Sequence, residues 1–381
     1  MHRLKAFLVG LLVFRLLTVA GPLLLVTARS WRGRFEGFFL SVFGVMLTAG
    51  IVCVWYLATG RLPPAALTVV AFVSFAATGL LSFALVATLR KCHFGEGAVG
   101  AHYFGNPPNL GASGWTDTAE DYAWLLVLLV TRLDPWMPRA EAVAARAGVR
   151  ELVEAVQSHA DYHGLVRIGI SDVLIRGRLD PEHCYSYLPP SPAADGRFGL
   201  LVFLNGHGTN HLIVLHALRP LCDELRMVLV CPTFGYGNWE APGGVEAAER
   251  AMRFALAAFP TDPRRVIVMG YSQGGAGVSR LGARCAAELA GLVYISPTME
   301  PAVIESQAFR DGWRGKPVLV IQGERDHNVK PRTVAAAVET MQANAALVTT
   351  HTDADAGHFL FFAKLAEVRG VIAAWALRST I

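Results

Sequence analysis

The second half of the chain alternates short apolar runs with helix-like stretches, and this alternation restricts the fold more than any other feature. The runs are rich in branched side chains and bounded by turn residues, as buried parallel strands are. They cover residues 198–204, 227–231, 265–269, 292–295 and 317–321, with helical stretches at 244–258, 273–289 and 333–343. The pattern predicts an α/β fold, a doubly wound and mostly parallel sheet with functional groups at the carboxyl ends of its strands.

The amino-terminal part has a different pattern, with three long apolar stretches at residues 6–27, 38–59 and 65–88. Each is near the ~20 residues that an α-helix needs to cross a bilayer. The second and third are nearly free of charge, and a Gly- and Pro-containing turn separates them, which predicts a helical hairpin. A buried hairpin in a water-soluble protein is the alternative. Arg15 interrupts the first stretch, for which a signal peptide is the competing interpretation.

These patterns divide the chain into a multi-pass transmembrane segment at 1–91, a connector at 92–179 and a catalytic domain at 180–381. Within the connector, the apolar run at 123–130 is too short to cross a bilayer but long enough to lie along one. Residues 140–160 show helical periodicity.

Charge is distributed in the way that orients membrane proteins. The formal net charge is +4, yet residues 1–91 hold nine Lys and Arg against one acidic residue, leaving 25 basic against 29 acidic residues in the remainder. The positive charge therefore flanks the apolar stretches and does not indicate nucleic-acid binding. Five Lys and Arg against three predict that the catalytic domain faces the cytoplasm.

The six cysteines are scattered without a C-x-x-C pair, so we expect neither a metal site nor a redox motif. Buried free thiols are expected instead, and a pairing of Cys222 with Cys231 is left open.

Residues 265–275 predict a strand, a sharp glycine turn and a helix, with Ser272 in the turn. A nucleophile on such a turn has its Oγ exposed above the sheet, and its neighbours must be small, as Gly270 and Gly274 are. G-x-S-x-G alone is weak evidence in a chain with 37 glycines, but here the branched strand precedes it and the helix follows it.

The segment Gly-Tyr-Ser-Gln-Gly-Gly resembles the nucleophile elbow of α/β-hydrolases, especially the phospholipase/carboxylesterase, dienelactone hydrolase-like and polyhydroxybutyrate depolymerase-like serine esterases. The resemblance covers about residues 182–377. A second motif, Asn-Gly-His-Gly at 205–208, is similar to the family's His-Gly-x-Gly loop, with Asn205 where the family commonly has His. By this resemblance the backbone amides of His207 and Gln273 form the oxyanion hole.

Two later segments resemble the remaining active-site loops of the family. Residues 323–329 are similar to its G-x-x-D-x-x-V loop, and residues 353–359 to its terminal Gly-His turn. The resemblance implies a triad in which Ser272 is the nucleophile, His358 the base and Asp326 the acid that orients the base. Glu324 and Asp355 are the alternative acids, and His327 and His351 the alternative bases.

The aromatic loop at 232–239 follows a predicted strand, and similar esterases place this loop over the acyl pocket. Trp239 and Tyr236 are therefore predicted to contact substrate, with packing on the core as the alternative. His211 and His216 are expected on a helix surface.

The leading hypothesis is a membrane-anchored serine hydrolase that cleaves a carboxylic ester or thioester through an acyl-enzyme. No metal and no organic cofactor are expected, and the expected partners are a small acyl substrate and the lipid bilayer. A small-peptide serine peptidase with the same triad and a catalytically silent interaction module are the alternatives. The sequence does not indicate the oligomeric state.

Overall fold

The structure, a computed structural model, describes residues 101–104, 119–162, 165, 184–234 and 237–379. The chain divides into two compact units. One comprises Met1–His93, Leu110–Leu125 and Arg167–Gly169, and the other comprises Phe94–Asn109, Leu126–Val166 and Ile170–Ile381. The predicted membrane helices at 6–27, 38–59 and 65–88 lie outside the described residues, and within the described ranges no helix is both long and apolar enough to cross a membrane.

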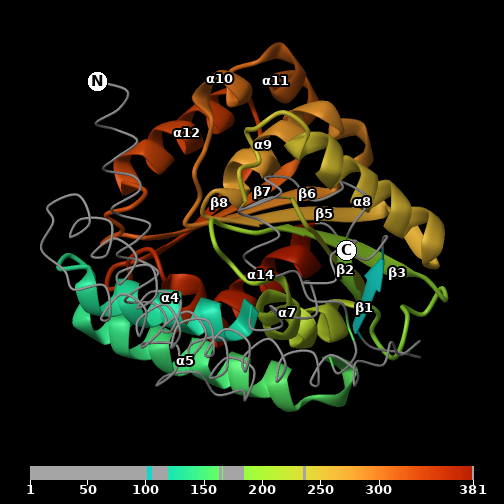
Figure 1. Cartoon of the computed structure of the whole chain (residues 1–381). Helices are drawn as coiled ribbons and strands as arrows, with labels where there is room; N and C mark the ends of the chain where they lie inside the picture. Colours follow the sequence, from blue (N-terminus) through green and yellow to red (C-terminus); the bar gives the residue numbers. More distant parts are fainter. Residues whose placement is uncertain (1–100, 105–118, 163–164, 166–183, 235–236, 380–381) are drawn as a thin grey trace, which may run out of the picture. The chain divides into compact units, whose positions relative to one another are not determined.

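The second unit is built on one sheet that contains eight strands in the described part of the chain, in the order β1-β2-β4-β3-β5-β6-β7-β8 (Figure 1). Strands β3 to β8 run parallel to one another, and β1 and β2 form an antiparallel edge. The bounds are β1 Ala101–Phe104, β2 Cys184–Tyr187, β3 Phe198–Leu204, β4 Met227–Pro232, β5 Thr261–Tyr271, β6 Gly291–Ile295, β7 Pro317–Gly323 and β8 Leu347–Asp353. The predicted mostly parallel α/β sheet is confirmed.

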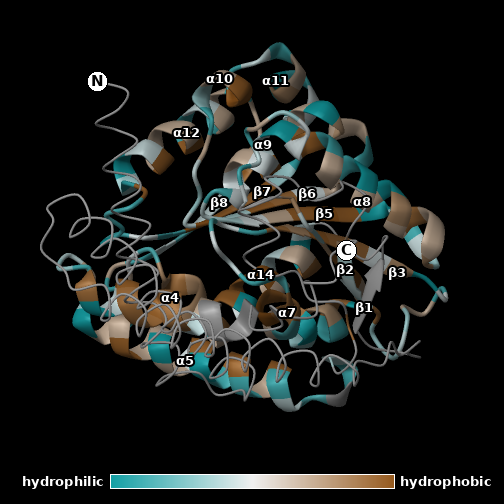
Figure 2. Cartoon of the chain, in the orientation of Figure 1, coloured by the Kyte–Doolittle hydropathy of each residue, from teal (hydrophilic) through white to brown (hydrophobic). Residues whose placement is uncertain are grey.

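Helices cover both faces of this sheet (Figure 1). On one face lie α8 (Gly244–Ala258), α9 (Gly274–Arg284) and α12 (Pro331–Ala343), and on the other lie α7 (His211–Leu225) and α14 (Leu365–Ser379). The shorter elements are α10 (Pro301–Ile304), α11 (Gln307–Trp313), α13 (Leu360–Ala363), η1 (Ala160–Tyr162) and η2 (Ala286–Glu288). Every residue of β3, β4 and β6 is buried, and Figure 2 shows β5 and β6 in the brown of hydrophobic residues, as expected for strands covered on both faces.

The sheet changes winding direction between β3 and β5. The chain leaves β3 through α7 toward β4 and then crosses back through α8 to β5, which pairs with β3 as far as Leu204 opposite Gly270. The carboxyl ends of two neighbouring strands that lead in opposite directions leave a crevice, which is where ligands bind in open α/β sheets. Asn205 and Ser272 follow these two ends.

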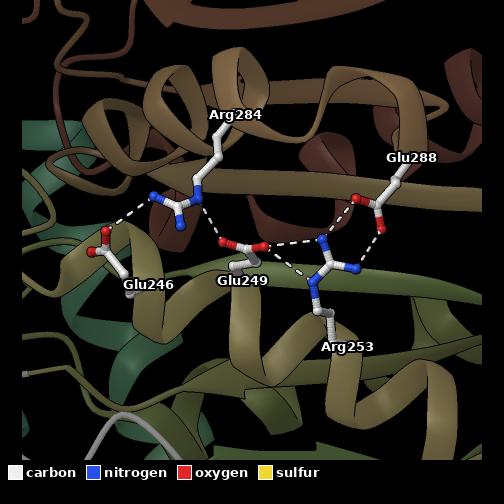
Figure 3. Close-up of polar contacts among 5 residues, drawn as sticks. All are labelled: Glu246, Glu249, Arg253, Arg284 and Glu288. Atoms are coloured by element: carbon white, nitrogen blue, oxygen red, sulfur yellow. Dashed lines mark hydrogen bonds and ion pairs between the residues drawn. The ribbon is translucent and has the colours of Figure 1, made fainter.

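Helices α8 and α9 are joined by a network of ion pairs (Figure 3). Glu249 lies between two arginines, with Arg253 at 3.0 Å and Arg284 at 2.6 Å. Arg253 also pairs with Glu288, and Arg284 with Glu246. Exposed pairs stabilise little individually, but the shared carboxylate links the helix that follows the β5 turn to its neighbour.

Helix α5 (Arg139–Ser158) confirms the helix predicted at 140–160, and it packs against α7 and α13. Its contact with α13 is close because Gly148 lacks a side chain: a Cβ there would lie 2.6 Å from the carbonyl oxygen of Phe362. Helix α4 (Ala119–Leu133) contains the apolar run at 123–130, and Arg146 of α5 donates to the carbonyl of Thr131 in α4 at 3.1 Å.

The described cysteines are buried free thiols, as predicted, and burial raises the pKa of each. They are Cys184, Cys222, Cys231 and Cys285.

Candidate active site

The sharp turn between β5 and α9 holds Ser272 in a left-handed conformation with φ of 54°. The turn is fixed on both sides, since the Ser272 amide donates to the carbonyl of Ile295 at 2.9 Å and the Ser272 carbonyl accepts from Gly275 at 2.9 Å. A non-glycine residue in this region is strained, and such strain is frequent at functional sites. The predicted nucleophile therefore occupies an elbow whose geometry the surrounding sheet imposes.

Two glycines permit the close crossing of the elbow. A Cβ at Gly270 would lie 2.4 Å from the carbonyl oxygen of Gly274, and a Cβ at Gly274 would lie 2.0 Å from that of Leu204. Neither distance is possible between real atoms, so only glycine fits at these positions. This is the physical reason for the small neighbours in the G-x-S-x-G pattern.

The side chain of His358 lies next to that of Ser272, with 2.9 Å between His358 Nε2 and Ser272 Oγ. On the other side of the ring, His358 Nδ1 is 2.8 Å from Asp326 Oδ2. Tyr271 also contacts His358: its hydroxyl donates to the carbonyl of His358 at 3.0 Å, and the centroids of the two rings are 5.6 Å apart. The structure thus brings together the three side chains that the resemblance assigns to a triad.

Asp326 has a fully buried side chain whose oxygens accept four hydrogen bonds. Oδ1 accepts from the backbone amides of Asn328 and Val329 at 2.9 and 2.8 Å. Oδ2 accepts from Gln322 Nε2 at 3.1 Å and from His358 Nδ1. An acceptor at Nδ1 keeps the proton of a neutral imidazole there, which leaves Nε2 free to accept the Ser272 proton.

The alternative acids and bases lie away from the Ser272 hydroxyl. Glu324 and His327 are exposed, and the exposed carboxylate of Asp355 pairs with Arg325 at 2.8 Å. His351 lies on β8 with its Nε2 3.4 Å from the carboxylate of Glu367. None of these four makes a hydrogen bond with Ser272 within the described residues.

The loop after β3 lies against the elbow. A Cβ at Gly206 would be 2.9 Å from the Cβ of Ser272, so the next residue, His207, follows directly beside Ser272. The side chain of His207 bonds to Asn238, and the side chain of Gln273 bonds to Glu240. The Gln273 amide donates to no group in the described part of the chain, and it stands at the amino end of α9, where the helix dipole favours negative charge.

Asn205, which replaces the more common His of the family motif, is 3% exposed. Its side-chain amide donates to the carbonyl of Gly206 at 3.0 Å, and its own carbonyl accepts from the indole of Trp239 at 2.8 Å. Asn205 and Trp239 therefore brace the loop between them.

Trp239, one of the two predicted substrate contacts, is buried in the core. The side chain has no exposed surface, packs against Phe234 and lies over Gly277 of α9. Its bond to Asn205 explains the burial, because an indole N–H in the core needs an acceptor. Tyr236, the second predicted substrate contact, lies outside the described residues.

His211 and His216, expected on a helix surface, are half-buried on α7. The ring of His211 stacks on Tyr185, and His216 Nδ1 lies 3.0 Å from the hydroxyl of Tyr162. Burial lowers the pKa of both imidazoles to about 4. Both imidazoles pack between α7 and its neighbours, and both are uncharged at neutral pH.

No group of three or more His, Cys, Asp or Glu side chains that could hold a metal ion occurs in the ranges that the structure describes.

Three residues that support the site were missed in the sequence. Tyr271 and Gln322 stand beside the motifs, at the ends of β5 and β7, where side chains reach the loops above the sheet. The third is Glu141 of α5, which is buried next to the His358 turn. The sequence feature that could have indicated the burial of Glu141 is its position on the apolar face of the helix. It lies in one stripe with Ala145, Val149, Leu152 and Val156.

Residues 201–314 match the model of the alpha/beta hydrolase family. This match and the mostly parallel sheet support membership of that superfamily. No curated protein matches the chain.

Solved esterase structures are similar to about half of the chain. One of the two fungal esterases from Rhizomucor miehei shares 14% identity, with 53% of this chain and 82% of that chain covered and a TM-score of 0.42. A hyperthermophilic esterase from Pyrobaculum calidifontis shares 15%, with 52% and 82% covered and a TM-score of 0.42. Est1E from Butyrivibrio proteoclasticus shares 16%, with 53% and 97% covered and a TM-score of 0.41.

Proposed function

We propose that this protein is a serine hydrolase that cleaves a carboxylic ester or thioester through an acyl-enzyme, and that its amino-terminal segment anchors it in a membrane. The observation that carries the proposal is the continuous array from Ser272 Oγ through His358 to the buried Asp326, with distances of 2.9 and 2.8 Å. The family match over residues 201–314 supports the same class of enzyme.

The array can perform acyl transfer in two steps. His358 Nε2 takes the Ser272 proton as Oγ attacks the substrate carbonyl, and the proton then passes to the departing alcohol or thiol. Water attacks the resulting acyl-serine with the same base, which returns the serine. Asp326 stabilises the imidazolium that forms in each step without itself taking the proton.

The negative charge that develops on the carbonyl oxygen needs donors that are already in place. The amides of His207 and Gln273 are proposed for this role, since the first follows Gly206 beside the elbow and the second begins α9. Removal of one such donor costs about 3–4 kcal/mol of transition-state stabilisation in enzymes of this kind.

A catalytically silent interaction module is the weaker candidate. The strained backbone at Ser272 and the burial of the Asp326 carboxylate each cost the fold free energy, and such features are frequent at functional sites. A binding module has no need of either.

The decisive test is labelling with a fluorophosphonate, which reacts with an activated serine. We expect the purified full chain to be labelled and Ser272→Ala to remain unlabelled. Ser279→Ala is the matched control, because Ser279 is a buried serine of the adjoining helix whose hydroxyl bonds to Gly275 and Tyr294. Folded wild-type protein that stays unlabelled would refute the enzyme and favour the interaction module.

Ester specificity rests on the resemblance of the elbow to serine esterases, and it needs its own measurement. Wild type and Ser272→Ala are compared on p-nitrophenyl esters of increasing acyl length, on thioesters and on peptide amides. We expect Ser272-dependent hydrolysis of esters or thioesters that far exceeds that of amides. Faster cleavage of small peptide amides would replace the esterase by a peptidase.

Membrane anchoring is proposed from the apolar stretches at 38–59 and 65–88, and the cytoplasmic side from the flanking charges. The full chain is expected to stay with membranes after an alkaline carbonate wash. A carboxyl-terminal epitope should resist protease in intact cells and be cleaved after permeabilisation. Release by carbonate would contradict the anchor, and cleavage in intact cells would contradict the orientation.

A further inference from the structure

Helix α5 brings a buried carboxyl group to the turn that carries His358. Glu141 is 5% exposed, and neither of its carboxyl oxygens has a hydrogen-bond partner in the described part of the chain. Because a buried polar group without a partner destabilises a fold, its presence here calls for a reason other than packing.

Helix capping does not supply that reason. Glu141 is the third residue of α5, where a glutamate ordinarily reaches back to the backbone N–H of the residue that caps the helix. The capping residue of α5 is Pro138, which has no N–H. The side chain of Glu141 is directed into the protein instead.

The carboxyl group lies against the residue that precedes the base. A Cβ at Gly357 would be 2.5 Å from Glu141 Oε2, so the carboxyl group lies directly against this glycine and a larger residue there would displace it. The amides of Gly357 and Phe359, on either side of His358, act on the carboxyl as donors but do not reach hydrogen-bond geometry in the structure. Glu141 therefore contacts the turn at the residue that precedes His358.

Among the residues that the structure describes, three titratable groups act on Glu141 from the surrounding elements. They are Asp326 from the loop after β7, His358 from the turn before α13, and Tyr271 from the end of β5. Burial raises the pKa of Glu141, with a smaller rise from Asp326, while the two amides and His358 act in the opposite direction. The carboxyl thus ionises at higher pH than an ordinary glutamate and closer to the range where an imidazole titrates.

We propose that Glu141 is a positioning residue of the active site, which holds the Gly357–Phe359 turn by contact and adds a second carboxyl group to the surroundings of His358. The inference rests on the proposed hydrolase function. It assigns a role to α5, which the sequence predicted only as part of a connector.

The electrostatic part has a definite sign. An ionised Glu141 favours the protonated form of the nearby imidazole, which cannot act as a base. Removing this charge while keeping the shape of the side chain should let the base work at lower pH. A role in packing alone predicts no such change, because glutamine fills the same space.

The experiment compares the full chain with Glu141→Gln, Glu141→Ala and Glu151→Gln, the last an exposed glutamate of the same helix. The rate of fluorophosphonate labelling and kcat/KM for an ester are measured from pH 5 to 9, with thermal unfolding as the control for folding. For Glu141→Gln we expect an unchanged melting temperature and an acid limb shifted to lower pH by about 0.5–1 unit. For Glu141→Ala we expect a loss of about tenfold in kcat, because the turn loses its contact. Glu151→Gln should match wild type.

A Glu141→Gln profile that superimposes on that of a labelled wild type would overturn the inference and leave the hydrolase intact. If the wild type is not labelled, the hydrolase fails, and the inference is then tested by NMR titration of the His358 imidazole, assigned by the resonance lost in His358→Gln. A lower titration midpoint in Glu141→Gln supports the contact between Glu141 and the turn, and an identical midpoint overturns it.

Discussion

Replacing Asp326 by asparagine should remove nearly all turnover while leaving the fold intact, and the surrounding hydrogen bonds determine why. Oδ1 accepts from two backbone amides, those of Asn328 and Val329, whose N–H groups cannot rotate away. In Asp326→Asn the amide oxygen must therefore stay at this position. The new NH₂ group then replaces Oδ2 and faces His358 Nδ1 at the 2.8 Å position.

An NH₂ group only donates, so Nδ1 must become the acceptor and the ring proton must move to Nε2. This tautomer cannot accept the proton of Ser272. Such a change is expected to lower kcat about 10⁴-fold, which corresponds to about 5.5 kcal/mol of activation free energy.

Stability should respond less than turnover. Gln322 Nε2 also donates to Oδ2 and would meet the new NH₂ group, but Gln322 Oε1 has no partner in the described part of the chain. A flip of the Gln322 amide would offer this oxygen as an acceptor but would lose the long bonds from Nε2 to the carbonyls of Val329 and Gly323, at 3.2 and 3.3 Å. We therefore expect the free energy of unfolding to fall by about 1–3 kcal/mol, still less than the loss in activation free energy.

The assay is hydrolysis of a p-nitrophenyl ester by the full chain, together with thermal unfolding of the same samples. Asp355→Asn is the matched control, since Asp355 lies in the neighbouring loop with 79% of its side chain exposed. We expect this control to behave as wild type. The reasoning is refuted if Asp326→Asn keeps more than about a tenth of the wild-type kcat, or if the Asp355 variant is the one that loses activity.

Three further predictions use thermal unfolding of the full chain. Gly274→Ala should lower the free energy of unfolding by about 1–3 kcal/mol or more, because its Cβ would lie 2.0 Å from the carbonyl oxygen of Leu204. The control is Gly370→Ala on the exposed side of α14, where a Cβ meets no atom within 4 Å, so this variant should be neutral or stabilising. Equal effects of the two substitutions would contradict the steric argument. Trp239→Phe should cost about 1–3 kcal/mol and slow ester hydrolysis, because Asn205 loses the indole donor at 2.8 Å; an unchanged kcat would separate this bond from the oxyanion loop. Burial acts to raise the pKa of Asp353, but the hydrogen bond from Lys364 and the amides of Asp355 and Ala356 outweigh it, so the pKa is lowered. A carboxyl group with a lowered pKa in the folded state stabilises the fold above pH ~4, and this stability is lost as the pH falls through the pKa of the folded state. Lys364→Met should therefore be less stable than wild type at pH 6, and the difference should shrink toward pH 3. A difference that does not depend on pH would contradict the pairing of Lys364 with Asp353.

The parallel strands and the meeting of Ser272, His358 and Asp326 could be predicted because short segments specify them. Strands β3 and β4 are uninterrupted apolar runs, since both faces of the sheet are covered. The elbow at Ser272 and the turn at His358 each need glycines at fixed positions, and these requirements appear in the local sequence. Chain order then restricted which acid and which histidine could meet the serine.

Other elements could not be predicted because their pattern depends on neighbours. Strand β8 lies at the sheet edge and most of its residues are polar, with all but the last exposed or half-buried, so it lacks the apolar run of a central strand. The local sequence around Trp239 is compatible both with a side chain that lines a pocket and with one that packs inward. The burial of Trp239 depends on the acceptor that Asn205 presents from another strand end, which no local pattern indicates.

The sequence predicts a domain boundary at residue 180, but the residues that position His358 lie on both sides of it. Leu360 and Phe361 of α13 are at most 1% exposed, and α5 packs against this short helix through Gly148. A chain without α5 would expose part of this apolar surface and would lose the contact of Glu141 with Gly357. Because α13 begins two residues after His358, a loosened α13 would also leave the His358 side chain less firmly positioned. The physical unit that supports the Ser272–His358–Asp326 array therefore includes α5. A histidine turn specified by its own sequence still packs against a helix from a distant segment, which holds it in place.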